Sequence, residues 1–328
     1  MKVSLLSLYK FLVLTSAAVI SPLVFLNTSH NVANRPFTEV PDPRFKIEVS
    51  FDGPKLPLIS CLMNTVEFLV VLGLQDFSGS MEQAAWKLDG YPEVGIVILP
   101  RAEGGRIERR FVIWGLSQGA AHMIHLIRFQ TVTFTLSWEG EEVGTIELVD
   151  WPTTQYTSRG THMNWMQNLT QQPNLSIVQS PSSPPVIPQN TNITAENAHD
   201  GHLMVWAMLT GSTVPLFDVF LLVIAVLVDA AKLGVTEQLC DYASPADVVG
   251  IEVTFKGPVP ARMSPPFFEV QWLMKTIASL PEYMIRKGVF KEALVLVEID
   301  GVRVADGFLG KKEAGVGLTN VNSSISAV

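Results

Sequence analysis

Hydrophobic and polar positions follow one order in the first half of the chain, from Gly95 to Val149. A short apolar strand is followed by a stretch from 111 to 128 whose apolar residues recur near helical spacing. A hairpin is predicted from 131 to 148. In its first strand, from 132 to 138, Val, Phe, Leu and Trp alternate with Thr and Ser, and the return strand follows a glycine-containing turn. The pattern predicts a strand, a helix and a β-hairpin.

The same order recurs between Val249 and Gly310. A strand at 250–255 is followed by a predicted helix at 267–280, which we expect to end at Pro281, and by a hairpin at 293–308. The strand from 294 carries apolar residues on both faces, which favours a central position in a sheet. We therefore predict two strand–helix–hairpin pseudo-repeats.

Each pseudo-repeat is preceded by a very apolar helical stretch, at 59–77 and at 214–235. The first of these follows a strand at 45–51, and a mostly polar segment at 79–93 is predicted as a connection. Helices this apolar need cover from a sheet, from each other or from a ligand. The predicted fold is α+β, with the two pseudo-repeats forming one mainly antiparallel sheet packed against apolar helices.

One further similarity has two interpretations. The octet Ile47–Pro54 matches Ile251–Pro258 at six positions. It is either another sign of the repeat or a case of strand–turn chemistry arriving twice at similar residues.

These patterns divide the chain into six segments. They are a signal peptide (1–26), a flexible extension (27–44), a first α+β half (45–150), a disordered and glycosylated linker (151–199), a second α+β half (200–310) and a flexible tail (311–328).

Composition and charge bear on whether the chain binds nucleic acid or contacts a membrane. Hydrophobic residues make up 48% of the chain and charged residues only 16%, and the net charge is −8. A surface that follows nucleic acid phosphates is therefore not predicted. The stretch 214–235 is long enough for membrane contact, but Asp218 and Asp229 interrupt it, so a buried helix is favoured over a membrane span.

The first residues indicate the secretory route. Lys2 and Lys10 precede or flank an apolar run, and small residues at 16–18 offer a cleavage site. An uncleaved anchor is the alternative. Both send the chain into the secretory pathway, and secretion is the favoured localisation. Five N-x-[ST] triplets are candidate glycosylation sites, at Asn27, Asn168, Asn174, Asn192 and Asn322.

The motif Gly115-Leu116-Ser117-Gln118-Gly119 is the sharpest catalytic candidate. This short string resembles the nucleophile elbow of esterases and thioesterases in the α/β-hydrolase family, which implies Ser117 as nucleophile on a strand–turn–helix. That family needs an acid and then a histidine after the serine, and the last histidine of the chain is His202. The repeat places Ser117 inside a helix, where its small neighbours would allow close packing.

Other polar groups suggest no cofactor or metal. His122 and His125 lie on one helix face without a third ligand. In the run from His199 to His202, Asp200 is explained as the N-cap of a helix. Cys61 and Cys240 either form one disulfide or remain two buried thiols.

Three hypotheses for function follow. The leading one is a secreted, non-catalytic glycoprotein that binds a partner or a hydrophobic ligand between its pseudo-repeats. The others are a serine hydrolase using Ser117 and a membrane-anchored lumenal protein. The sequence names no ligand, substrate or oligomeric state.

Overall fold

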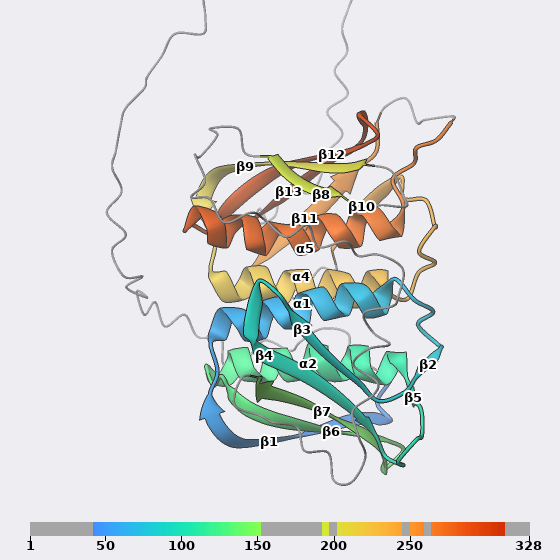
Figure 1. Ribbon diagram of the computed structural model, residues 1–328. Coiled ribbons are helices and arrows are strands. Elements are labelled where there is room, and N and C mark those ends of the chain that lie inside the picture. Colours follow the sequence, from blue (N-terminus) through green and yellow to red (C-terminus); the bar gives the residue numbers. More distant parts are fainter. Residues whose placement is uncertain (1–41, 152–191, 197–201, 245–249, 259–263, 312–328) are drawn as a thin grey trace, which may run out of the picture. The chain divides into compact units, whose positions relative to one another are not determined.

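The computed structural model describes residues 42–151, 192–196, 202–244, 250–258 and 264–311 (Figure 1). All of them belong to one unit, Arg35–Val328. The predicted signal peptide (1–26), most of the predicted extension and linker, and the tail beyond Lys311 lie outside the described residues.

The first half builds a five-stranded antiparallel sheet in the order β1-β6-β7-β4-β3. A short pair of β2 and β5 lies beside it. Its elements are β1 (Phe45–Lys55), α1 (Leu58–Gly73), β2 (Ser80–Met81), β3 (Ala84–Leu88), β4 (Tyr91–Pro100), β5 (Ile107–Glu108), α2 (Arg109–Leu126), β6 (Gln130–Trp138) and β7 (Glu141–Asp150).

The second half builds a six-stranded antiparallel sheet in the order β10-β11-β13-β12-β9-β8. Its elements are β8 (Asn192–Glu196), β9 (His202–Thr213), α4 (Leu216–Ala230), β10 (Asp241–Ala243), β11 (Ile251–Lys256), α5 (Val270–Lys287), β12 (Lys291–Ile299) and β13 (Val302–Lys311).

The two halves repeat one topology. Each element of the first half has a counterpart in the second, and the counterparts follow the same order in the sheet. The pairs are β1 and β9, α1 and α4, β3 and β10, β4 and β11, α2 and α5, and the two hairpins. The second sheet has one additional strand, β8, outside β9. A connection repeats as well: Leu56 donates its backbone N–H to Phe129, and Val214 donates to Phe290, both at 3.1 Å. The predicted pseudo-repeat is confirmed and extends further toward the N-terminus than predicted.

The matching octets are not part of this repeat. Ile47–Pro54 lies on β1, whose counterpart is β9, whereas Ile251–Pro258 begins on β11, whose counterpart is β4. The similarity therefore reflects strand–turn chemistry that arose at two different places in the fold.

The hairpins repeat in detail. Glu139-Gly140 and Asp300-Gly301 form the two turns, and all four residues have positive φ, as a type I′ turn requires. Each hairpin then has a bulge at the same place, between Leu136 and Ser137 and between Val297 and Glu298.

The helices lie between the two sheets and pack on one another (Figure 1). Helix α4 contacts α1, α2 and α5, and α1 also contacts α2 and α5. Phe129 and Phe217 stack across the halves with ring centroids 6.1 Å apart. The α+β class and antiparallel pairing are confirmed. The single predicted sheet is corrected to one sheet for each half, because the helices separate the sheets and cover their inner faces.

Four local predictions are wrong. The segment 79–93 was expected to be a connection, yet it contains β2, β3 and the start of β4. Helix α5 continues past Pro281, because Tyr283 and Met284 beyond it bury against the core. His202 begins a strand rather than the helix that Asp200 was expected to cap, and Asp200 itself lies outside the described residues. Strand β8 lies inside the range predicted as a disordered linker and pairs with β9.

Helix α4, the core of the stretch that we considered for membrane contact, is 15 residues long. No helix among the described residues is both long and apolar enough to cross a membrane.

Candidate functional site

Ser117 lies inside the continuous helix α2 and is only 7% exposed. Residues 111–114, which a nucleophile elbow would need as a strand, are part of that helix, as the helix predicted at 111–128 requires, so the strand–turn–helix of an elbow is not the geometry at this serine. Counting back from the helix C-caps Ile127 and Gly288, the counterpart of Ser117 in α5 is Ala278, which is also buried.

The glycines of this motif bring α2 close to the first sheet. A Cβ atom on Gly119 would lie 2.4 Å from Cε2 of Phe134, and one on Gly115 would lie 2.6 Å from Cδ2 of Leu136. Both distances are far below ordinary contact. The expectation that small residues serve helix packing is confirmed.

Among the described residues, His122 and His125 on α2 gather no third metal ligand. His122 stacks on Phe51 with ring centroids 6.0 Å apart, and burial, followed by the nearby His125, lowers the pKa of His122. Within the described ranges, no group of three or more His, Cys, Asp or Glu residues could hold a metal ion. His199 lies outside those ranges.

The two cysteines are unpaired. Cys61 is buried in α1, and burial raises the pKa of its thiol to about 12, whereas Cys240 is exposed. Of the five predicted glycosylation sites, Asn27, Asn168, Asn174 and Asn322 lie outside the described residues. Asn192 is the first residue of β8 and takes the register position opposite Trp206 on β9.

Packing between the halves explains why the helices are so apolar. Leu62, Val66 and Leu69 of α1 are at most 1% exposed, as are Leu222 and Val226 of α4. Gly73 at the end of α1 lies against Met274 of α5, whose Cε would be 2.2 Å from an added Cβ. The helices thus supply the cover that we expected a sheet, a counterpart or a ligand to supply.

A polar cluster lies at the seam where α1 packs on α5 and on β4. Glu282 of α5 pairs with Arg286, and burial, followed by the Glu282 charge, raises the pKa of Glu67 to about 7. Burial also raises the pKa of Tyr91 on β4, and the Glu282 charge adds to this effect. Glu67 is half-buried.

Asn64 of α1 fixes the β3–β4 turn at this seam. Its Nδ2 donates to the carbonyls of Ser60 and Tyr91, each at 2.9 Å, and its Oδ1 accepts the backbone N–H of Leu88 at 2.6 Å. A buried amide that is fully hydrogen-bonded serves the structure, and we assign this part of the cluster to folding.

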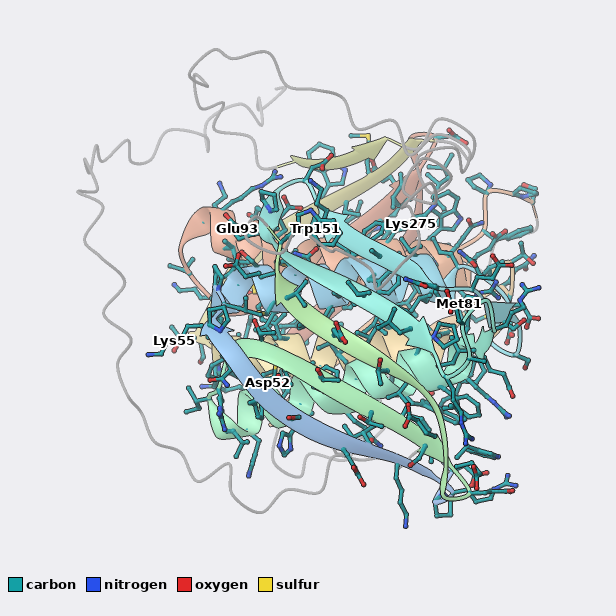
Figure 2. The ribbon with its side chains drawn as sticks, turned by 60° about the horizontal axis from the view of Figure 1, so that its bottom comes forward. Asp52, Lys55, Met81, Glu93, Trp151 and Lys275 are labelled. Atoms are coloured by element: carbon teal, nitrogen blue, oxygen red, sulfur yellow. The ribbon has the colours of Figure 1, made fainter. Side chains whose placement is uncertain are left out.

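The outer faces of the two sheets differ in chemistry. In the first half, Thr133 on β6 pairs with Ser50 on β1 and Glu147 on β7. Residues directly opposite one another in an antiparallel pair share a face. This polar face comes forward in Figure 2, where Asp52 and Lys55 are labelled on β1. Trp151, also labelled in Figure 2, lies against Gly95 of β4, and its backbone N–H donates to Glu93 at 3.0 Å.

The second half is apolar at the same register positions. Leu294 on β12 is the counterpart of Thr133 on β6, and it pairs with Met208 on β9 and Phe308 on β13. In the next row Trp206 and Leu296 take the places of Glu48 and Thr135. We call the following set the apolar face: Trp206, Met208, Leu294, Leu296 and Phe308.

The apolar face is open to solvent at its centre. Met208 is 58% exposed and Leu294 is 45% exposed, while the other three residues are half-buried. The predicted central place of the strand from 294 is confirmed, since β12 lies between β13 and β9. However, the helices cover only the inner side of that strand.

Comparisons with known proteins do not assign this chain to a family. No family model matches the chain, and no curated protein gives a significant match. One solved structure, the tandem DUF26 ectodomain of the Arabidopsis thaliana cysteine-rich receptor-like protein PDLP8, aligns with 81% of this chain and 96% of its own. Its sequence identity is 10% and its TM-score is 0.22, and a likeness at this level carries no argument about fold or function.

Proposed function

We propose that the chain is a non-catalytic protein of the secretory route that binds a protein partner through its apolar face. The observation that carries this proposal is the change from polar to apolar at five matched positions of two sheets with one topology. Because the two halves share the fold, folding alone does not require Met208, Leu294 and Phe308 to be apolar. Exposed apolar patches on proteins mark binding sites.

The route and the non-catalytic role have separate support. The leader and the five sequons favour entry into the secretory pathway, followed by secretion. Ser117 sits in a helix interior that lacks the strained turn by which hydrolases activate their serine. A hydrophobic ligand between the halves is not needed to explain the apolar helices, since these helices bury one another.

Site-specific photocross-linking tests the binding role. We would place benzoylphenylalanine at position 294 in one variant and at the matched position 133 in another, and irradiate cultures of a eukaryotic secretory host. We expect a discrete covalent adduct from position 294 and none from position 133, because only the first lies on the apolar face. A folded, secreted protein that gives no adduct from position 294 would contradict the proposal.

A further inference from the structure

Four charged residues around the apolar face, Glu292, Glu298, Arg303 and Asp306, are already hydrogen-bonded within the second half of the chain. Glu298 accepts from Nε1 of Trp206 at 3.1 Å, and Arg303 donates through Nε to Asp306 at 2.6 Å. Glu292 accepts from the backbone N–H groups of Ser212 at 2.9 Å and Lys311 at 3.2 Å. Burying a charged group costs far less when its hydrogen bonds remain made. The rim of this face can therefore lose water without leaving these carboxylates unsatisfied.

The face also carries charges of both signs. Glu252 lies near the start of β11 and Lys256 lies at its end. On β13, Arg303 forms an ion pair with Asp306. An isologous contact sets a patch against its own copy, so a patch of one sign would repel itself. The chain as a whole carries a net charge of −8, and Lys256 and Arg303 offset part of the negative charge on this face.

The apolar residues of this face are arranged on neighbouring strands, as in sheets that pack on a second sheet. Two antiparallel sheets pack face to face when apolar residues of their inner faces interdigitate. The apolar face offers such residues on three neighbouring strands, β9, β12 and β13. Strand β8 pairs with β9 only as far as Trp206, which lies opposite Asn192, so Met208 lies beyond the described residues of β8. A second copy would bring the same exposed row to the contact.

We propose that the apolar face binds a second copy of this chain, giving a symmetric dimer in which the two six-stranded sheets pack face to face. This inference rests on the proposed function and names its partner. Phe308, Leu294 and Met208 form the centre of the contact, and the internally paired charges form its rim. The first sheet, with Ser50, Thr133 and Glu147 at the same positions, stays in solvent.

Molar mass in solution tests the dimer. The full chain, secreted from a eukaryotic host, would be measured by light scattering over a range of concentrations. We expect a dimer, and we expect Leu294→Asp to weaken its Kd about tenfold or more, since a charge would enter the contact centre. The matched variant Thr133→Asp should leave the Kd unchanged. Met208→Asp provides a second disruption at the most exposed position, and circular dichroism would confirm that each variant folds.

Three results of the mass measurements would overturn the dimer. The wild-type chain could be monomeric at all concentrations, or Thr133→Asp could weaken association as much as Leu294→Asp. In the third, Asn192→Gln or enzymatic deglycosylation would convert a monomer to a dimer, in which case a sugar at the edge of the face is its native cover.

The mass of the cross-linked adduct from position 294 separates the two proposals. An adduct to a different protein ends the dimer but keeps the binding role, whereas no adduct ends both.

Discussion

Replacing Gly119 with alanine should lower the free energy of unfolding by about 2 kcal/mol, because the new methyl group overpacks the α2–sheet contact. Its Cβ would lie 2.4 Å from Cε2 and 2.5 Å from Cζ of Phe134, a ring that is fully buried on β6. Helix propensity alone predicts the opposite sign, a gain of about 1 kcal/mol for glycine to alanine. The direction of the change therefore decides between packing and propensity.

Two neighbours in the same helix serve as controls. Gly115→Ala should cost less than Gly119→Ala, since the nearest atoms are the ends of the flexible Leu136 and Ile146 side chains. Ser117→Ala should change stability by less than about 0.5 kcal/mol, because its counterpart in the second half is already Ala278. Urea unfolding would measure all three. Equal or greater stability in Gly119→Ala would show that Phe134 can move away.

The same helix shows what short motifs can and cannot establish. G-x-S-x-G is a catalytic signature only when a strand precedes the serine, and the match here arises from glycines that face a sheet. Comparison with the second pseudo-repeat predicted the helix from sequence alone. Counted from the helix C-caps, the counterpart of Phe111 in α5 is Trp272.

Local patterns predicted the hairpins and the apolar helices well. Alternation and the turn at Asp300-Gly301 are local signals, and the structure has both hairpins at the predicted places. Strand β3 was missed because the contacts that hold it are distant in sequence. Trp86 stacks on Phe68 at 5.5 Å, and Leu88 is held by Asn64 of α1.

The apolar face was visible in the sequence but was explained differently. Leu294 and Leu296 alternate with Val295 and Val297, so both faces of the strand are apolar, which predicted a central position in a sheet. The strand is central, but within the described residues only the valine side is packed against helices. Periodicity reports how apolar each face is. It cannot say whether the cover comes from the same chain or from a partner.

Replacing Glu67 with glutamine should make stability less dependent on pH. Burial, and after it the Glu282 carboxylate, raises the pKa of Glu67 in the folded protein to about 7 from an ordinary value of 4.5. Ionising this group in the folded state therefore costs about 2 to 3 kcal/mol, allowing for its partial exposure. The counterpart in α4, counted from the N-cap prolines Pro57 and Pro215, is the uncharged Ala225.

The sign follows from proton binding. Between about pH 4.5 and pH 7 the unfolded chain releases the Glu67 proton while the folded protein keeps it, so this group lowers the free energy of unfolding as pH rises. Below that window both states are protonated, and above it both are ionised and the full penalty applies. Arg286 limits the effect through its pair with Glu282, and Tyr91 faces the same seam without adding charge.

Urea unfolding of the wild type and Glu67→Gln at about pH 5 and about pH 8 would test this window. The variant should be nearly as stable as the wild type at the lower pH and more stable by about 2 kcal/mol at the higher pH, because the amide cannot ionise. Glu48→Gln, on the exposed outer face of β1, should change stability by less than about 0.5 kcal/mol at either pH. If Glu67→Gln destabilises the protein equally at both pH values, the carboxylate is held at the seam by favourable contacts and its pKa is not raised.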